Sequence, residues 1–298
     1  MMSQLEDFYA SRTGEHETIL PRPDPVVYGE GLKKSQHALA QEQLEFYEQN
    51  GFLVLESYMP DMVEPLLAET ERLRYELKGR DELITEPDSD ELRSIFKPQA
   101  FSEIVERFSR DARILDIVTQ LIDSEVYIHQ SRINVKPALV GKSFPWHSDF
   151  ETWHVEDGMP KPRALSGWIM LTENLEYNGP LYVIPGSHKH YVSCAGKTPA
   201  QNYQQSLKKQ TYGTPSFATL KALATERGIA GVYGSPGTVV FHESNLMHGS
   251  PDNISVWSRI NLFCVYNSIH NCPVNPYGAQ VPRPEYISNR DYSALHPY

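Results

Sequence analysis

The spacing of apolar residues changes character near residue 125 of this chain. Before that point, apolar residues recur at helical intervals in three segments, 38–50, 62–77 and 112–122. Gly51 suits the C-cap of the first segment, and the apolar run 52–55 that follows is typical of a strand. The pattern therefore predicts a mainly helical part over 39–125.

After residue 125, short runs rich in β-branched and aromatic residues alternate with Gly, Pro and Asn turns. They predict strands over 126–135, 164–171, 181–184, 238–241 and 259–266. Many short strands of this kind indicate a mainly β fold with flanking helices, and we expect a double-stranded β-helix, the jelly roll of cupin-like proteins. The polar, partly helical stretch 193–228 is predicted to be an insertion between strands.

The pattern also divides the chain into an arm and one domain. Residues 1–38 are polar and interrupted by Pro21, Pro23 and Pro25, which predicts an extended N-terminal arm, and no chemistry is assigned to it. Residues 39–298 are predicted to form a single domain, with the helical part at 39–125 and the jelly-roll core at 126–298.

The composition of the chain argues against several classes of partner and cofactor. With 38 acidic and 27 basic residues, the net charge of -11 repels phosphate backbones, so nucleic acid is not an expected partner. No apolar run approaches the ~18 residues of a membrane span, and the N-terminus lacks the blocks of a signal peptide, so we expect a cytoplasmic protein with no membrane partner. The 3 cysteines form no C-x-x-C pair, which argues against cysteine-bound zinc.

The β-rich half carries the candidate metal ligands. His147 and Asp149 form an H-x-D pair, which period-two alternation would place on one side of a strand. A second histidine from a distant strand would complete a face of two histidines and one carboxylate, which leaves positions open on iron(II). Composition alone produces about one such histidine–acid pair, so the pair is weak evidence by itself. The second histidine we select is His248.

The sequence around His248 strengthens this hypothesis. The predicted strand 238–241 runs into a polar turn that ends in His248, Gly249 and Ser250. Arg259 then begins the next predicted strand, where its guanidinium and the Ser250 hydroxyl could clamp a carboxylate through charge-assisted hydrogen bonds. The far carboxylate of 2-oxoglutarate requires such a clamp.

Other interpretations of these residues stay open. His154 and Glu156 form a second histidine–acid pair, for which a solvated surface position is the simpler expectation. His242 competes with His248, although a core position or a supporting contact is expected for it rather than ligation. Arg259 could instead form a structural ion pair.

The run from Phe144 to Pro160 resembles the signature segment of the ectoine hydroxylases, within the phytanoyl-CoA dioxygenase-like branch of the 2-oxoglutarate oxygenases. Segments 178–181 and 184–188, and the later His-Gly-Ser with its spaced arginine, match the wider family. The resemblance covers roughly residues 40–298.

This resemblance implies a reaction and its residues. Ectoine would be hydroxylated to 5-hydroxyectoine, a compatible solute of salt- and heat-stressed bacteria, with iron(II), 2-oxoglutarate and O2, releasing succinate and CO2. Asp149 fits a hydroxylase, because halogenating relatives have a small residue there. Iron(II) would be held by His147, Asp149 and His248. The implied 2-oxoglutarate contacts are Asn134, Lys136, Phe144, Ser250 and Arg259. The implied substrate contacts are Gln130, Arg132, Thr152 and Trp153.

Two alternative functions are kept beside this one. The same chemistry could act on another small amino acid derivative, because a fold and its metal site do not determine the substrate. A cupin-like protein could also bind a metal or a small molecule without catalysis. A homodimer is expected only because homodimers are the commonest oligomers.

Overall fold

The computed structural model describes residues 7–29, 35–87 and 89–298 as strands, helices and their connections. The strands are β1 (Thr18–Pro21), β2 (Phe52–Leu55), β3 (Leu83–Thr85), β4 (Leu92–Phe96), β5 (Val126–Lys136), β6 (Phe144–His147), β7 (Ala164–Met170), β8 (Leu181–Val183), β9 (His190–Ser193), β10 (Ala230–Val232), β11 (Val239–Glu243), β12 (His248–Ser250) and β13 (Arg259–Ser268). The α-helices are α1 (Gln41–Asn50), α2 (Val63–Glu76), α3 (Glu103–Ser109), α4 (Ala112–Ile122), α5 (Asp149–Thr152), α6 (Tyr203–Ser206) and α7 (Phe217–Arg227). A π-helical turn, Trp153–Asp157, continues α5.

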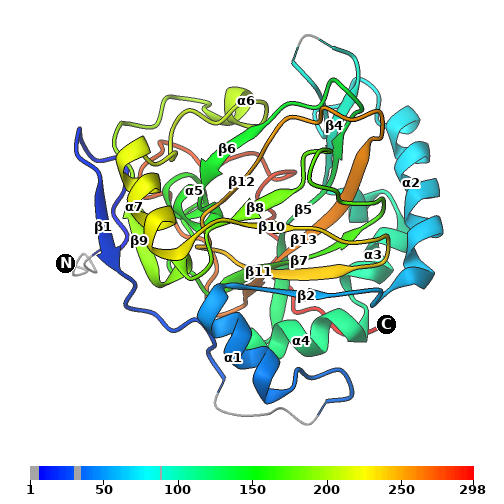
Figure 1. Cartoon of the computed structure of the whole chain (residues 1–298), viewed down its shortest axis with the longest axis horizontal. Helices are drawn as coiled ribbons and strands as arrows, with labels where there is room; N and C mark the ends of the chain where they lie inside the picture. Colours follow the sequence, from blue (N-terminus) through cyan, green and yellow to red (C-terminus); the bar gives the residue numbers. More distant parts are fainter. Residues whose placement is uncertain (1–6, 30–34, 88) are drawn as a thin grey trace.

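Two antiparallel sheets build the centre of the molecule (Figure 1). The larger has 7 strands in the order β2-β11-β7-β13-β5-β4-β3, and the smaller has 4 in the order β10-β8-β12-β6. Apolar side chains from both sheets form one buried cluster, made of Trp168, Met170, Val183, Val232, Val240, Leu246 and Phe263. This arrangement confirms the predicted jelly roll.

The helices α1 to α4 contribute to a second core on the other side of the larger sheet. Because side chains alternate along a strand, Val239 and Phe241 of β11 join this helical core while Val240 joins the cluster between the sheets. The predicted helices at 38–50, 62–77 and 112–122 correspond to α1, α2 and α4. Gly51 ends α1 with a left-handed φ of 81°, which glycine adopts without strain.

The larger sheet also takes strands from the part of the chain expected to be mainly helical. β2 pairs with β11, and β4 pairs with β5, so sheet and helices do not separate at residue 126. β3 and β4 are only 3 and 5 residues long, which is too short for alternation to identify them. The division into domain parts stays a prediction.

The described residues of the predicted N-terminal arm pack against the rest of the chain. β1 pairs with β9, with Thr18 opposite Ser193. Tyr9 is buried, and its ring centroid lies 4.9 Å from that of Phe150 and 5.0 Å from that of Tyr191. The arm thus reaches the segment that follows β6.

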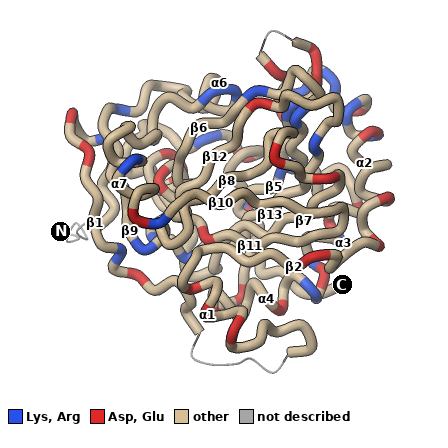
Figure 2. The backbone as a smooth tube through the Cα atoms, in the orientation of Figure 1, with Lys and Arg blue, Asp and Glu red and all other residues tan. Residues whose placement is uncertain are grey.

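Charged residues are interspersed along the backbone, with Lys and Arg positions mixed among Asp and Glu positions (Figure 2). Among the described residues, the basic side chains are therefore not concentrated on one helix or strand, although the net charge of the whole chain is -11. Within those residues, no helix combines the length and apolarity that crossing a membrane would require.

Candidate metal centre and active site

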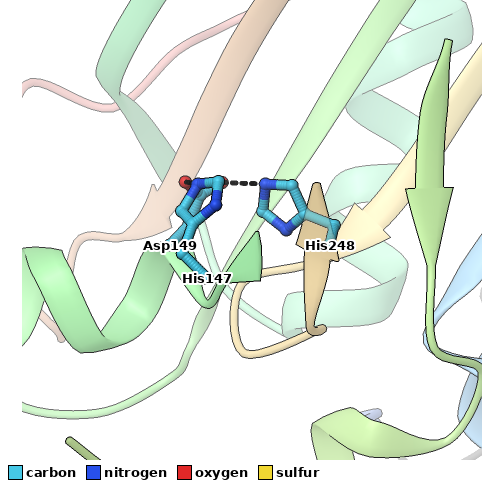
Figure 3. A group of neighbouring side chains, drawn as sticks. All are labelled: His147, Asp149 and His248. Carbon is cyan, nitrogen blue, oxygen red and sulfur yellow. Dashed lines mark ion pairs between the residues drawn. The ribbon is translucent and has the colours of Figure 1, made fainter. Parts of the chain in front are cut away.

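Three side chains converge between the two sheets: His147 at the end of β6, Asp149 at the start of α5 and His248 at the start of β12 (Figure 3). β6 and β12 are antiparallel neighbours, and His147 stands directly opposite His248 in their register. Nε2 of His147 lies 3.5 Å from Oδ1 of Asp149, and Nε2 of His248 lies 3.9 Å from Oδ2. One ligand atom of each residue lies within 4.8 Å of the other two, close enough for all three to bind one ion.

The H-x-D pair does not lie on one strand, and this part of the prediction is wrong. β6 ends at His147, and the Ser148 hydroxyl accepts a hydrogen bond of 3.4 Å from the backbone N–H of Glu151, which makes Ser148 the N-cap of α5. A serine placed before a short helix favours this turn over strand continuation. Asp149 is therefore directed by a helix start rather than by strand alternation.

The tautomers of two imidazoles suit metal binding. Nδ1 of His147 lies 2.8 Å from the carbonyl of Pro145, and Nδ1 of His248 lies 2.9 Å from the carbonyl of Leu246. A carbonyl only accepts, so each Nδ1 carries the proton and each Nε2 keeps its lone pair toward the cluster. Burial and the neighbouring His147 lower the pKa of His248 to about 3, so its ring is neutral at physiological pH.

His242 has the opposite tautomer. Its Nδ1 accepts a hydrogen bond of 3.0 Å from the indole N–H of Trp168, which can only donate. The neutral ring then carries its proton on Nε2, which faces Oδ2 of Asp149 at 3.6 Å. At this distance Nε2 of His242 forms no hydrogen bond among the described residues, so the supporting role expected for His242 stays a prediction.

The donor set fits an iron(II) site. Burial raises the pKa of the Asp149 carboxyl, but His248, His147 and His242 outweigh this and hold the pKa well below its ordinary value. Two imidazoles and one carboxylate match the facial arrangement of non-haem iron(II) oxygenases. The structure thus brings together the three residues singled out in the sequence.

A cavity beside this cluster is lined by all five residues that the resemblance assigns to 2-oxoglutarate binding. Along β5, Ile133 and Val135 point into the helical core, so the alternate residues Asn134 and Lys136 line the cavity between the sheets. Arg259 of β13 stands opposite Lys136, and its guanidinium donates a 2.8 Å hydrogen bond to Oδ1 of Asn134. Phe144 and Ser250 line the same cavity.

The cavity concentrates positive charge. Burial, with Arg259 and Arg93 nearby, lowers the pKa of Lys136 to about 6. Burial, with Arg132 and Arg93 nearby, lowers the pKa of Arg259 to about 9. The buried Nε of Arg259 has no hydrogen-bond partner among the described residues. A bound dicarboxylate would relieve both the crowding of cations and this missing contact.

A second cavity meets the first at Arg132, Phe144 and His147. Asp149 and all four residues assigned to the substrate line it, namely Gln130, Arg132, Thr152 and Trp153. The guanidinium of Arg132 lies 5.3 Å from the centroid of the Phe263 ring. The metal cluster therefore faces two adjoining cavities.

Two arginines of these cavities were missed by sequence reasoning. Arg93 on β4 lines the first cavity and forms a buried ion pair of 2.8 Å with Glu86, and a charge within an apolar strand could have drawn attention to it. Arg283 lines the second cavity, and its guanidinium donates to both carboxylate oxygens of Asp157, at 2.8 and 2.5 Å. It lies between two prolines near the C-terminus, where no local pattern marks it.

The expected surface position of His154 and Glu156 is wrong. His154 is 1% and Glu156 2% exposed. The His154 ring stacks on Tyr277 at 3.9 Å between centroids, and Glu156 forms an ion pair of 2.6 Å with Arg12. Both partners come from distant parts of the chain, which a pairwise motif cannot reveal.

Comparisons with known proteins agree with this geometry. A family model described as phytanoyl-CoA dioxygenase matches residues 47–261. The ectoine dioxygenase of Bordetella bronchiseptica is 51% identical to this chain over 303 aligned residues, which cover 100% of the chain and 97% of the relative.

Crystal structures show the same similarity in three dimensions. EctD from S. alaskensis with 2-oxoglutarate and 5-hydroxyectoine superposes with a TM-score of 0.89 at 40% identity, covering 98% of each chain. EctD from the same organism with bound Fe gives a TM-score of 0.87 at the same identity and coverage. With its family model matched over 47–261 and a relative 51% identical along its whole length, this chain belongs to the phytanoyl-CoA dioxygenase family.

Proposed function

We propose that this protein is an iron(II)- and 2-oxoglutarate-dependent dioxygenase that hydroxylates ectoine to 5-hydroxyectoine. The observation that carries the proposal is the convergence of His147, Asp149 and His248 where a cationic cavity meets a second cavity. The relative that is 51% identical over the whole chain is an ectoine dioxygenase, which supports the choice of substrate. O2 is the co-substrate, and succinate and CO2 are the other products.

Iron(II) held by His147, Asp149 and His248 would supply the oxygen-activating chemistry of the reaction. The chain's own contribution is orientation. The carbonyls of Pro145 and Leu246 hold the two imidazoles with their Nε2 atoms toward the cluster. In this proposal His242, whose Nε2 faces Oδ2 of Asp149 at 3.6 Å, orients the carboxylate of Asp149.

The cationic cavity binds 2-oxoglutarate in this proposal. Arg259 and Ser250 hold the far carboxylate, and Asn134 orients the guanidinium of Arg259 through its 2.8 Å hydrogen bond. Lys136 adds a charge that forms when the dianion binds, because a nearby anion raises the pKa of a buried ammonium group. The dianion thereby becomes the counter-ion of the cavity.

The second cavity suits a small cyclic zwitterion such as ectoine. The face of Trp153 can receive the delocalised amidinium, a contact worth about 0.5 to 2 kcal/mol. Arg283, fixed by Asp157, can pair with the carboxylate at the other end. Gln130 and Thr152 line the same space with hydrogen-bonding groups, and Arg132 lies where the two cavities meet.

Two measurements test the proposal in sequence. Anaerobic addition of iron(II) and 2-oxoglutarate should produce the charge-transfer absorption of a keto acid chelated to iron, and Asp149→Ala should abolish it. On admission of O2, succinate should form in step with ectoine consumption and 5-hydroxyectoine formation. Succinate formation with another amino acid derivative but not with ectoine would assign a different substrate. Absence of the absorption and of O2 consumption would leave a non-enzymatic binding protein.

The cellular setting belongs to the same proposal. We propose a cytoplasmic location, which the three free cysteines Cys194, Cys264 and Cys272 support because reducing compartments keep thiols unpaired. A homodimer is proposed from the frequency of such assemblies alone.

A further inference from the structure

Arg12 lies behind the proposed substrate cavity and contacts the segment that forms one of its walls. It belongs to the predicted N-terminal arm, to which the sequence assigned no chemistry, and it is 4% exposed. The segment in question consists of α5 and the π-helical turn, and it carries Asp149, Thr152 and Trp153.

One guanidinium joins two buried carboxylates of this segment. Nε and Nη2 of Arg12 donate to the two oxygens of Glu151 at 2.9 and 2.7 Å, and Nη1 donates to Glu156 at 2.6 Å. Glu151 belongs to α5 and Glu156 to the π-helical turn, so the contact spans both parts of the wall. Arg12 forms the only ion pairs to either carboxylate within the described part of the chain.

Further hydrogen bonds and close backbone packing surround the ion pairs of Arg12. The Ser11 hydroxyl donates to Glu151 at 2.6 Å, and the backbone N–H of Arg12 donates to the carbonyl of Cys194 at 2.8 Å. Gly213 has a φ of +71°, and a Cβ there would overlap both the Glu151 carboxylate and the Arg12 guanidinium. The insertion thus packs its backbone directly against the ion pair.

The network reaches the cavity through Thr152. Nη2 of Arg12 lies 3.4 Å from the Thr152 hydroxyl, which also accepts a hydrogen bond of 3.2 Å from the side-chain amide of Gln210. Thr152, Trp153 and Gln210 all line the second cavity. The co-substrate residues lie on β5, β6, β12 and β13, and in the described part of the chain none of them forms a hydrogen bond or an ion pair with Arg12.

We infer that Arg12 is a positioning residue for the substrate: the arm neutralises Glu151 and Glu156 and so holds Thr152 and Trp153 at the cavity. Without Arg12, two carboxylates would stay buried and uncompensated, and the segment would shift to hydrate them. The inference rests on the proposed function, because it assigns the second cavity to ectoine. It predicts a defect in substrate binding that is separable from co-substrate binding.

The test uses the full-length protein with Arg12→Gln, and with Arg22→Gln as the matched control. Arg22 is also a buried arginine of the arm, with an ion pair of 2.8 Å, but its partner Glu243 lies on β11 and not on the cavity wall. Arg12→Gln should raise KM for ectoine about tenfold or more while KM for 2-oxoglutarate changes by less than about twofold. Arg22→Gln should lower Tm without raising KM for ectoine.

A second readout does not depend on turnover. With nickel(II) in place of iron(II) and 2-oxoglutarate present, calorimetry should show the same loss of ectoine affinity in Arg12→Gln. Should that variant fail to fold, Arg12→Lys carries the test, because an ammonium cannot bridge both carboxylates as the planar guanidinium does. Its KM for ectoine should lie between those of the wild type and a truncated cavity wall variant, Thr152→Ala/Trp153→Ala.

The outcomes separate the two proposals. Wild-type KM for ectoine in the folded Arg12 variants, or an equal rise in Arg22→Gln, would overturn the positioning role while leaving the proposed function intact. If the wild-type protein neither binds nor hydroxylates ectoine, the proposed function fails and the inference fails with it.

Discussion

The nitrogen that carries the proton differs among the three histidines of the site. It is Nδ1 in His147 and His248, the proposed ligands, and Nε2 in His242, the proposed supporting residue. His248→Ala should therefore abolish iron(II) binding and turnover, because it removes a lone pair directed at the cluster. His242→Ala should retain the ion but weaken its binding by about 10- to 100-fold, the usual effect of losing a group that orients a ligand. Iron stoichiometry and the dissociation constant measured anaerobically distinguish the two results.

The control for these variants is His270→Ala, which changes an exposed histidine outside both cavities. It should bind iron(II) as the wild type does. Equal loss of iron in His242→Ala and His248→Ala would contradict the assignment of the two roles.

We expect Lys136 to make the binding of 2-oxoglutarate dependent on pH. Its pKa of about 6 in the free protein leaves the amine mainly neutral above that pH, and a bound dianion raises this pKa by favouring the ammonium form. Binding of 2-oxoglutarate should therefore take up a proton at about pH 7.5, and its affinity should fall as the pH rises from about 6. Calorimetry in two buffers with different ionisation enthalpies measures the uptake.

Lys136→Met should abolish this proton uptake and weaken binding below pH 7 more than above it. Lys161→Met, whose side chain is 60% exposed, is the control and should behave as the wild type. Identical binding enthalpies in the two buffers would show that Lys136 keeps its charge state when the co-substrate binds.

At the scale of the element, one side of β5 packs into the helical core and the other side lines the two cavities, so we expect the first to stabilise the fold and the second to bind ligands. Ile133 lies in the helical core, and its neighbour Arg132 lies where the two cavities meet. Ile133→Ala should lower the free energy of unfolding by about 2–5 kcal/mol and leave both KM values unchanged. Arg132→Leu should raise at least one KM without such destabilisation, because it removes a half-buried cation whose pKa is lowered by desolvation.

Denaturant unfolding and steady-state kinetics of the two variants check this division. The comparison is internally matched, since the residues are adjacent on one strand. If Ile133→Ala raised a KM as much as Arg132→Leu, the strand would transmit core packing to the site and the two sides would not be independent.

Secondary structure followed the sequence where a pattern was long enough to read. α4 coincides with the predicted segment 112–122, and α7 lies within the stretch 193–228 that was predicted to be partly helical. Each of the two helices begins at a side-chain cap, Asp111 and Ser216. α3 and β4 were missed, since 7 and 5 residues hold too few periods. Local capping by Ser148 likewise outweighed the strand expected at Asp149.

At the scale of the molecule, ligands should stabilise the fold through mass action. The groups proposed to bind iron(II) and 2-oxoglutarate lie on β5, β6, α5, β12 and β13 and come together only in the folded protein. At 100 times its dissociation constant, one ligand adds about 2.7 kcal/mol. We expect Tm to rise by about 5 °C or more under anaerobic conditions, with no rise from iron(II) for Asp149→Ala. An equal rise in this variant would place the bound ion elsewhere.

By itself, the sequence determined the local chemistry of this protein. The H-x-D pair marked two of the ligands, and the resemblance to the ectoine hydroxylases pointed to Asn134 and Lys136, which line the same cavity from β5. The choice of His248 over His242 could be argued from spacing, but the physical reason for it is the set of neighbours that each ring meets.

Only the tertiary structure decided which distant groups complete the site. The carbonyl of Leu246 and the indole of Trp168 set the tautomers of His248 and His242, and the latter contact spans 74 positions of the chain. Arg12 reaches Glu151 across 139 positions. Such contacts leave no periodic trace in a sequence, because burial and charge compensation depend on what folding places next to a residue and not on its neighbours along the chain.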